Sequence, residues 1–421
     1  MKNGFIIKRA AWIFLIATVL VFSGPGAYAG IDGITGPTFN LTATTGYIST
    51  SEGGSYLMWG YANGAGLAQY PGPTLIVNEG DLVTVNLSNQ LTVPVSIVFP
   101  GQASVKALGG TQGLLTKEAP AAGGMVSYTF TATQPGTYTY YSGTQPDLQI
   151  EMGLFGALIV RPDTNPATQA YNHADSQFDH EYLFLLSEMD PDIHNQVLAG
   201  NMNPMDTTTY FPVYWLINGR TAPDTMWPAG DPLLPYQPYN CMPMMHPGEK
   251  ILLRMIGGGR DMHPLHTHGN HHKVIARDGR MLSSGVGADL AELAFTSTVV
   301  PGQTADAIFT WTGEKLGWDM YGHAPEDPQQ PNEYGLDHGK PFPVTLPNQL
   351  DITNGQFYSG SPFLGTMGYI PPGEGGYNTN SGFFYMWHSH NEKEITNNDI
   401  FPGGMLTMML IEAPGVELMN P

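Results

Sequence analysis

The sequence predicts an all-β protein that is built from two tandem β-sandwich domains. Short apolar runs, rich in β-branched and aromatic residues, alternate with turns, and the chain contains 52 Gly and 35 Pro. Charged residues make up only 12% of the chain, and this composition favours strands over helices. The order of turns and strands in the second half echoes the order in the first half, which indicates a duplicated sandwich.

Residues 1–29 have the features of an export signal. Basic residues precede an apolar run over 10–22, and Ala27-Tyr28-Ala29 is a small-residue cleavage site. The run is shorter than the ~20 residues that span a bilayer, so a membrane anchor is the less favoured alternative. We therefore expect cleavage near Ala29 and a secreted or periplasmic mature chain that has no membrane span.

The mature chain is strongly acidic. Removing residues 1–29 deletes three basic residues and no acidic one, which leaves 13 basic against 36 acidic residues and a net charge near −23. Nucleic acid is therefore not an expected partner, because its phosphates are bound by clustered Lys and Arg. Cys241 is the single cysteine, so an intrachain disulfide is excluded and hydrophobic cores must stabilise the fold.

Strand-like segments justify the two domains in order. In the first domain, over 30–163, they cover residues 74–77, 82–87, 95–99, 127–130, 137–140 and 157–160. A polar stretch over 164–178 is interpreted as a linker. In the second domain, over 179–421, the strand-like segments cover residues 182–186, 214–219, 251–254, 272–276, 307–311 and 382–388.

A long insertion at about 319–380 interrupts the second domain. It is rich in Pro, Gly and Asn, has little periodicity and is too long for an ordinary loop. We expect an ordered excursion over the surface, which serves either as a lid or interface element or as passive decoration.

Two histidine clusters carry the chemical information. One is His263-Pro264-Leu265-His266-Thr267-His268-Gly269, and the other is His388-Ser389-His390. An alternating His-x-His on a strand presents both imidazoles on one face. Two such pairs that face each other form a nitrogen-rich pocket suited to copper or zinc.

Several segments together resemble the multicopper oxidases, which are built from cupredoxin domains, a Greek-key type of β-sandwich. The resemblance rests on the two histidine clusters and on the motifs over 71–81, 152–160 and 217–224. It covers nearly all of the mature chain, and the His263–Gly269 motif is a specific signature. Because only two such domains fit, the chain is closer to two-domain laccases and nitrite reductases than to three-domain laccases.

The resemblance implies copper ligands that the first domain lacks. Multicopper oxidases supply histidines from two H-x-H segments of this domain. Val98 and Pro100 stand in the first of these segments, and Tyr141 and Gly143 stand in the second.

The ligand set of the blue copper also departs from the family pattern. Ser389 stands where the family has the cysteine that binds this copper, and Glu394 stands where it has a histidine. A serine hydroxyl does not replace a soft, anionic thiolate. His263 and Met405 align with the remaining ligands. They either retain a weak metal site or are a structural histidine and a core methionine.

By the same resemblance, His266, His268, His388 and His390 face the pocket that holds a trinuclear copper centre in the family. We expect them to bind one or two copper ions, with zinc as the second choice. The alternative is a hydrogen-bonded cluster without a metal. His271, His272 and the soft donors of Cys241–His246 are weaker candidates, for which a structural role is favoured.

Two functions from different classes remain open. The chain is either a copper-dependent oxidase or copper carrier that acts on a small reductant or metal ion, or a non-catalytic scaffold that has lost copper. The resemblance to two-domain relatives also implies a homotrimer, although a monomer is an equal alternative. In each case we expect little or no intense blue colour.

Overall fold

The computed structural model describes residues 30–202, 205–345, 360–363, 375–377 and 382–418. The export signal expected over 1–29 lies outside these residues. No helix in the described part of the chain has the length and apolarity that crossing a membrane requires.

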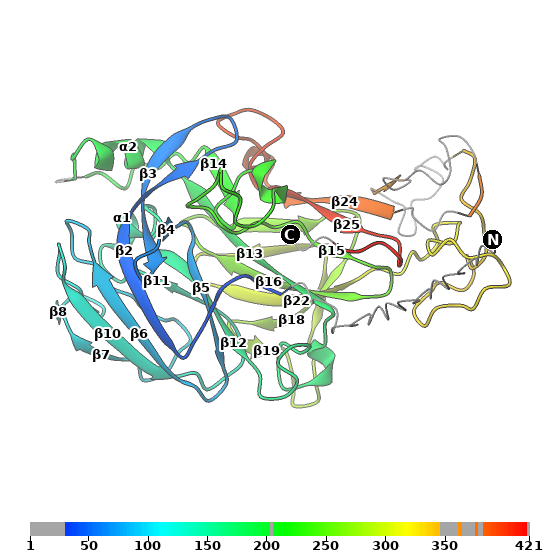
Figure 1. Ribbon diagram of the computed structural model, residues 1–421, viewed down its shortest axis with the longest axis horizontal. Coiled ribbons are helices and arrows are strands. Elements are labelled where there is room, and N and C mark those ends of the chain that lie inside the picture. Colours follow the sequence, from blue (N-terminus) through cyan, green and yellow to red (C-terminus); the bar gives the residue numbers. More distant parts are fainter. Residues whose placement is uncertain (1–29, 203–204, 346–359, 364–374, 378–381, 419–421) are drawn as a thin grey trace, which may run out of the picture.

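The first half of the chain forms two sheets (Figure 1). One contains, in spatial order, β1 (Ile34–Thr35), β5 (Gly72–Asn78), β12 (Phe155–Arg161) and β11 (Gly136–Tyr141). The other contains β4 (Ala68–Gln69), β3 (Ser55–Asn63), β2 (Thr38–Ser49), β6 (Leu82–Asn89), β10 (Met125–Thr131) and β7 (Lys106–Gly109). A small hairpin of β8 (Thr111–Gln112) and β9 (Lys117–Glu118) lies beside them.

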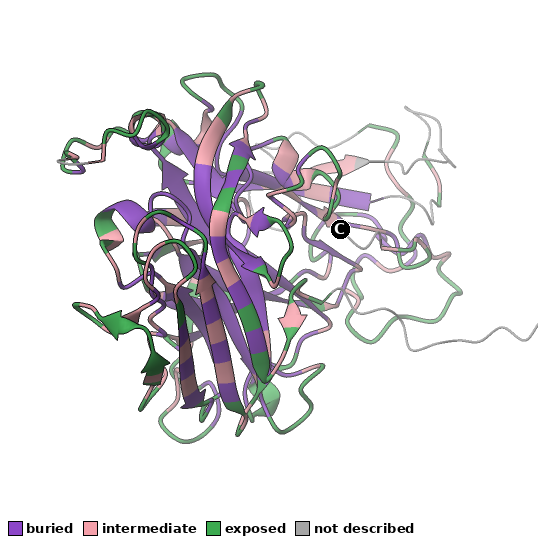
Figure 2. Ribbon diagram, turned by 60° about the vertical axis from the view of Figure 1, so that its left-hand side comes forward, coloured by how far each residue is buried: buried purple, intermediate pink, exposed green. Residues whose placement is uncertain are grey.

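Alternating burial holds these two sheets face to face. Along β6 every second residue is buried, and Figure 2 shows the same striping on the outer strands. Val83, Val85 and Leu87 of one sheet share a core with Leu75 and Leu158 of the other. This is the pattern of a sandwich in which each sheet has one apolar and one solvated face.

The second half also forms two sheets. The larger contains β14 (Tyr214–Ile217), β13 (His180–Met189), β16 (Lys250–Gly257), β22 (Thr304–Thr310), β18 (His272–Arg277) and β19 (Arg280–Met281), with β20 (Glu292–Ala294) paired to β18. The other contains β15 (Met244–Met245), β25 (Leu406–Ile411), β24 (Gly382–Ser389), β17 (His263–Thr267) and β21 (Thr296–Val299), with β23 (Ser361–Phe363) paired to β24.

Strand β13 joins the two halves. All of its residues are buried, because its two faces pack against different cores. Phe184 and Leu186 belong to the core of the second pair of sheets. Leu183 and Leu185 pack with Phe155 of the first half. A strand that is covered on both faces is expected to be apolar throughout, and β13 is so except at a few positions.

Helices are few and short. The described residues contain α1 (Pro146–Gln149), α2 (Pro191–Leu198) and the single turns η1 (Ala174–Ser176), η2 (Asp224–Met226) and η4 (Glu392–Ile395). Asp190 caps α2, since its side chain accepts a hydrogen bond from the backbone N–H of Asp192 at 2.9 Å.

One predicted strand is absent, and the positions of two other segments can be described. Residues 95–99 make only isolated bridges at Val95 and Val98, so the strand predicted there is absent. The segment 164–178 packs on the second half through the buried Tyr171 and Phe178. The described parts of the insertion over 319–345, 360–363 and 375–377 extend to one end of the molecule (Figure 1), and the other parts of 319–380 lie outside the described residues.

Candidate metal centre

Two neighbouring strands bring three histidines together. β17 and β24 pair as antiparallel neighbours, and their register places His266 opposite His388. Because side chains alternate along a strand, His268 lies on the same side as His266. One nitrogen from each of His266, His268 and His388 lies within 4.8 Å of the others. We call these three residues the histidine cluster.

Hydrogen bonds orient the rings of the histidine cluster. Nδ1 of His266 lies 2.8 Å from Oγ1 of Thr296 on the adjacent strand β21. The Nδ1–H of His388 donates to the backbone carbonyl of Ser389 at 2.6 Å. Such partners fix the tautomer of an imidazole, and they leave Nε2 of His388 unprotonated and able to bind a metal ion.

The spacing within the cluster suits a shared ion. Nδ1 of His268 lies 3.1 Å from Nε2 of His388. Two nitrogens bound to one ion at about 2.0–2.1 Å each are roughly 2.9–3.4 Å apart at tetragonal or tetrahedral angles. These two rings therefore need little movement to bind the same ion.

The protonation state of the cluster also suits a metal. Burial, and then the nearby charges of His388, His268 and His390, lower the pKa of His266 to about 4. Burial also lowers the pKa of His268 and that of His388. The imidazoles are therefore neutral at neutral pH and present lone pairs, as metal binding requires. This donor set fits copper or zinc.

His390 lies at the rim of the cluster. Its ring centroid is 4.7 Å from that of His266 and 5.9 Å from that of His388. Its side chain is 52% exposed, and its Nδ1 lies 3.8 Å from a carboxylate oxygen of Glu392. Of the four histidines expected to share the pocket, three converge and His390 borders them.

His263 lies away from the cluster, with its ring between two carboxylates. Its Nε2 is 2.8 Å from Glu188 Oε2, and its Nδ1 is 3.1 Å from Glu394 Oε2. Burial alone would lower the pKa of His263, but the hydrogen bonds and charges of the two carboxylates outweigh burial and raise it to about 9. His263 is therefore an imidazolium ion at neutral pH, and each of its nitrogens faces a carboxylate.

Glu188 is the residue at this site that the sequence analysis missed. It is one of two buried acidic residues, with Glu181, inside the largely apolar strand β13. Besides His263, it accepts hydrogen bonds from the hydroxyl of Tyr210 and from the backbone N–H of Asp261. Burial would raise the pKa of Glu188, but the hydrogen bond and charge of His263 lower it overall. An acidic residue in a buried strand was the available signal, because such a charge needs a partner.

A comparison with protein families finds a match in the first half of the chain. The family model described as multicopper oxidase matches residues 45–165.

Residues 45–165 are a multicopper oxidase domain.

Relatives of known name match a longer part of the chain than the family model does. The copper resistance protein A homolog of Pseudomonas syringae pv. tomato is 26% identical over 331 residues, which cover 68% of this chain and 51% of that protein. Copper resistance protein A of Escherichia coli is 26% identical over 295 residues, which cover 59% of this chain and 44% of that protein. The match thus spans about half of each relative.

The fold of the whole chain is shared with solved multicopper oxidases. The multicopper oxidase mgLAC aligns with a TM-score of 0.57 at 19% identity, covering 90% of this chain and 87% of that one. The blue copper oxidase of Nitrosomonas europaea aligns with a TM-score of 0.56 at 20% identity, covering 88% of this chain and 85% of that one. These comparisons confirm the all-β cupredoxin fold.

The residues that the multicopper oxidase pattern aligns with the blue copper lie together. The hydroxyl of Ser389 donates to Glu394 Oε2 at 2.5 Å, and this oxygen also lies beside Nδ1 of His263. Met405 is buried in the adjacent core, and its backbone N–H donates to the carbonyl of Glu394 at 2.7 Å. A hydroxyl and a carboxylate thus occupy two of the four positions, and they form hydrogen bonds with each other.

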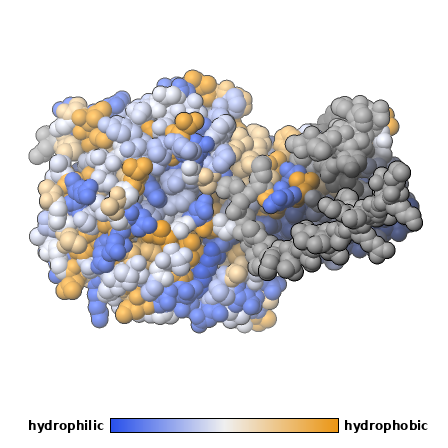
Figure 3. All heavy atoms as spheres, viewed as in Figure 1, coloured by the Kyte–Doolittle hydropathy of each residue, from blue (hydrophilic) through white to orange (hydrophobic). Residues whose placement is uncertain are grey.

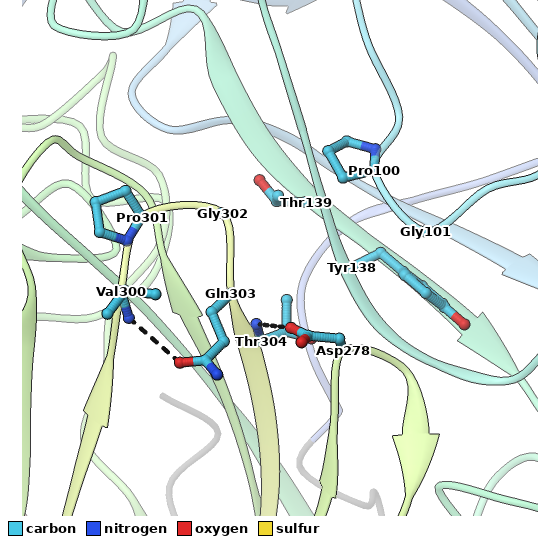
Figure 4. A pocket seen from close by; sticks show the side chains of 10 residues that line it. All are labelled: Pro100, Gly101, Tyr138, Thr139, Asp278, Val300, Pro301, Gly302, Gln303 and Thr304. Carbon is cyan, nitrogen blue, oxygen red and sulfur yellow. Dashed lines mark hydrogen bonds between the residues drawn. The ribbon is translucent and has the colours of Figure 1, made fainter.

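The first-domain positions of the multicopper oxidase pattern also meet, but they bring no metal donors. Val98 and Tyr141 form a β-bridge with N–H to carbonyl distances of 2.8 and 3.2 Å. A Cβ at Gly143 would lie 2.8 Å from Val98 Cγ1. Pro100 lies farther along, in a groove between the two halves that is lined by Tyr138, Asp278 and Gln303 among others (Figure 4). The lining of this groove contains no histidine or cysteine.

The weaker candidates have structural partners. Cys241 is buried in the core of the second half and its Sγ lies 3.4 Å from the carbonyl of Leu183, while burial raises the pKa of this thiol well above its usual range. Met244 and Met245 form β15, as expected for a packed strand approach. The two nitrogens of His272 lie 2.9 Å from Thr267 Oγ1 and 2.7 Å from Ser297 Oγ.

Proposed function

We propose that this protein binds a copper ion through His266, His268 and His388, with His390 available as a further ligand, and acts as an exported copper-dependent oxidase or copper carrier. The observation that carries the proposal is the convergence of three neutral imidazoles with a 3.1 Å spacing between two of the donor nitrogens. Imidazole suits copper, and relatives are named copper resistance proteins and multicopper oxidases.

The geometry narrows the oxidase chemistry that we propose. In the family, electrons enter at the thiolate-bound copper, whose position here contains Ser389, Glu394 and the imidazolium of His263. Electron entry by that route requires a thiolate, and Ser389 stands at that position here. A reductant must therefore meet the ion at the histidine cluster itself. The exposed rim at His390 provides that access, and it equally suits a carrier that releases its ion.

Copper content tests the site directly. We expect about one copper ion per chain in protein grown with copper, as the three-imidazole donor set implies, and loss of most of it in His268→Ala/His388→Ala. His271→Ala is the matched control, because His271 lies in the same turn and outside the cluster. Copper-grown protein without copper, or an unchanged copper content in the double variant, would favour the non-catalytic scaffold.

A second measurement separates oxidase from carrier. Oxygen uptake with a phenol or with Mn(II), dependent on the bound copper, identifies an oxidase. Transfer of the ion to a competing chelator without any turnover identifies a carrier. The homotrimer implied by the resemblance stays a prediction. Sedimentation equilibrium, which measures the oligomeric state, tests it.

A further inference from the structure

A second group of metal-binding side chains lies in the insertion. Asp319, His323, Glu333 and His338 each offer one ligand atom, and these atoms all lie within 4.8 Å of one another. They come from the described stretch 312–345, which consists of turns and irregular chain with one β-bridge, between Phe342 and Gly376. None of these residues belongs to the histidine cluster or to β17 and β24.

The distances between the donor atoms suit a tetrahedral ion. Nδ1 of His323 is 3.5 Å from Asp319 Oδ2 and 3.6 Å from Glu333 Oε2. Nδ1 of His338 is 3.7 Å from Asp319 Oδ2 and 2.7 Å from Glu333 Oε1. Ligand atoms bound tetrahedrally at about 2.0–2.2 Å are roughly 3.3–3.6 Å apart, so three of these four separations are close to the required edge.

Neighbouring groups already orient two of the four donors, Asp319 and His338. Asp319 accepts backbone N–H bonds from Tyr321 and Gly339, both at 2.8 Å. The Nε2–H of His338 donates to the carbonyl of Asp327 at 2.9 Å. That bond leaves Nδ1 of His338 as the nitrogen that faces the two carboxylates. Hydrogen bonds that hold the ligating side chains in orientation are typical of protein metal sites.

The second histidine has a donor atom without a partner. Nδ1 of His323 is buried but makes no hydrogen bond, although two carboxylate oxygens lie just beyond hydrogen-bonding distance. The His323 ring is stacked on Tyr321, with 5.4 Å between centroids and 15° between planes. A buried, oriented and unsatisfied nitrogen indicates a missing ligand, and an ion between the four groups would supply it.

The charge of these side chains also favours a bound cation. The carboxylates of Asp319 and Glu333 lie together in a small volume beside two imidazoles, and one divalent cation bound between them would neutralise the two carboxylates. The nearby ammonium of Lys340 is 2.8 Å from Asp337 and is thereby paired outside the group. Zinc accepts mixed nitrogen and carboxylate ligands in a tetrahedral geometry, and four protein ligands make a closed, structural site.

We propose that Asp319, His323, Glu333 and His338 bind a structural zinc ion that holds the insertion in its fold. Trp318 and Met320 anchor the start of this stretch in the core of the second half, but residues 321–345 contain no strand. An irregular segment with little core of its own gains order from a metal that ties its two ends together.

Zinc titration of full-length protein tests the proposal. The background is His268→Ala/His388→Ala, so that zinc in the histidine cluster does not contribute. After chelation and dialysis we expect about one zinc ion per chain to bind again, and binding to be lost when His323→Ala/His338→Ala is added. His173→Ala is the control, because His173 also lies beside a carboxylate, that of Asp175, but belongs to neither group of metal-binding side chains.

Three further experiments complete the test. Zinc should slow proteolytic cleavage between residues 319 and 345. Glu333→Gln, which keeps the shape of the side chain, should weaken zinc binding while leaving the near-ultraviolet circular dichroism unchanged. Cobalt(II) in the site should give the intense visible bands of tetrahedral coordination. The proposal is overturned if the background protein binds no zinc, or if removing both histidines leaves zinc binding intact.

Discussion

Single residues on β24 face two different environments. Ser389 is opposite Leu265, whose side chain belongs to the core of the second half, whereas His388 is opposite His266 in the histidine cluster. The side chain at position 389 therefore belongs to the buried side of the strand, and the imidazole donors lie on the other side. Under the proposed function, copper binding does not depend on a thiolate at position 389, because adjacent strand residues point in opposite directions.

Restoring the blue-copper ligands tests this separation. We expect Ser389→Cys/Glu394→His, grown with copper, to show an intense thiolate-to-copper absorption band, because His263 Nδ1 and Met405 already lie beside these positions. Ser389→Cys alone should show none, since Glu394 still occupies the place of the imidazole. A strong band in the unmodified protein would contradict the role given to Ser389.

Thr296 is expected to tune copper affinity through His266. Its hydroxyl lies 2.8 Å from His266 Nδ1, and removing such an outer partner typically weakens metal binding by about 10–100-fold. Thr296→Val should therefore raise the copper dissociation constant by this factor in a chelator competition assay. Thr298→Val, the same change at an exposed position of β21, should leave affinity unchanged.

At the scale of elements, β13 and β17 are joined by a buried charge triad. Glu188 of β13, His263 of β17 and Glu394 of η4 come from three segments that are distant in the sequence. Each charge is stabilised only while these segments remain packed, because an isolated buried charge is very costly. The triad thus makes the position of η4 depend on the second pair of sheets.

The triad gives stability a specific pH dependence. The pKa of His263 is raised to about 9 in the folded protein, against about 6.5 in an unfolded chain. A raised pKa contributes stability that is fully present below about pH 6.5 and is lost as the pH rises through about 9. This contribution is on the order of 3 kcal/mol. The difference in unfolding free energy between the wild type and His263→Gln, measured in urea, should shrink from pH 6 to pH 10. A constant difference would show that His263 is neutral in the folded state.

At the scale of the molecule, buried ion pairs connect the two halves. Arg254 of β16 lies 2.8 Å from Glu181 and 3.0 Å from Thr137 of the first half, and Arg161 of the first half also pairs with Glu181. The space-filling view shows hydrophilic and hydrophobic residues intermixed on the described surface (Figure 3), so the apolar contacts that stabilise the fold lie inside. Arg254 is the central cation of this inner contact.

Removing that cation should destabilise the whole protein. Arg254→Met leaves Glu181 with Arg161 as its remaining cation and removes the buried cation beside Asp306, and breaking such a buried pair costs about 3–5 kcal/mol. Arg277→Met is the control, because Arg277 is partly exposed and its pair with Glu292 contributes only about 0–1 kcal/mol. Urea unfolding of both variants compares the two losses. Equal losses would mean that Arg254 stabilises the halves no more than a surface residue does.

Much of the fold was accessible from the sequence. The strands over 82–87, 182–186 and 251–254 were confirmed, because alternation and apolar runs are local signals. The long strands β2 and β3 were not predicted. The strand expected over 95–99 was wrong, since Val95 and Val98 pair only singly with distant residues. Pairing with segments elsewhere in the chain is not encoded in a short window.

The candidate site was also predictable from the sequence only in part. Composition, alternation and the His-x-His pairs determined by themselves the all-β class, the donor types and the face on which His266 and His268 lie, because these are properties of neighbouring residues. Only the tertiary structure decided that His388 completes the cluster, that His390 stays at its rim, and that Glu188 and Glu394 enclose His263. It also decided that Asp319 meets His338. Distances between residues far apart in the chain depend on sheet register and packing, which no local pattern specifies.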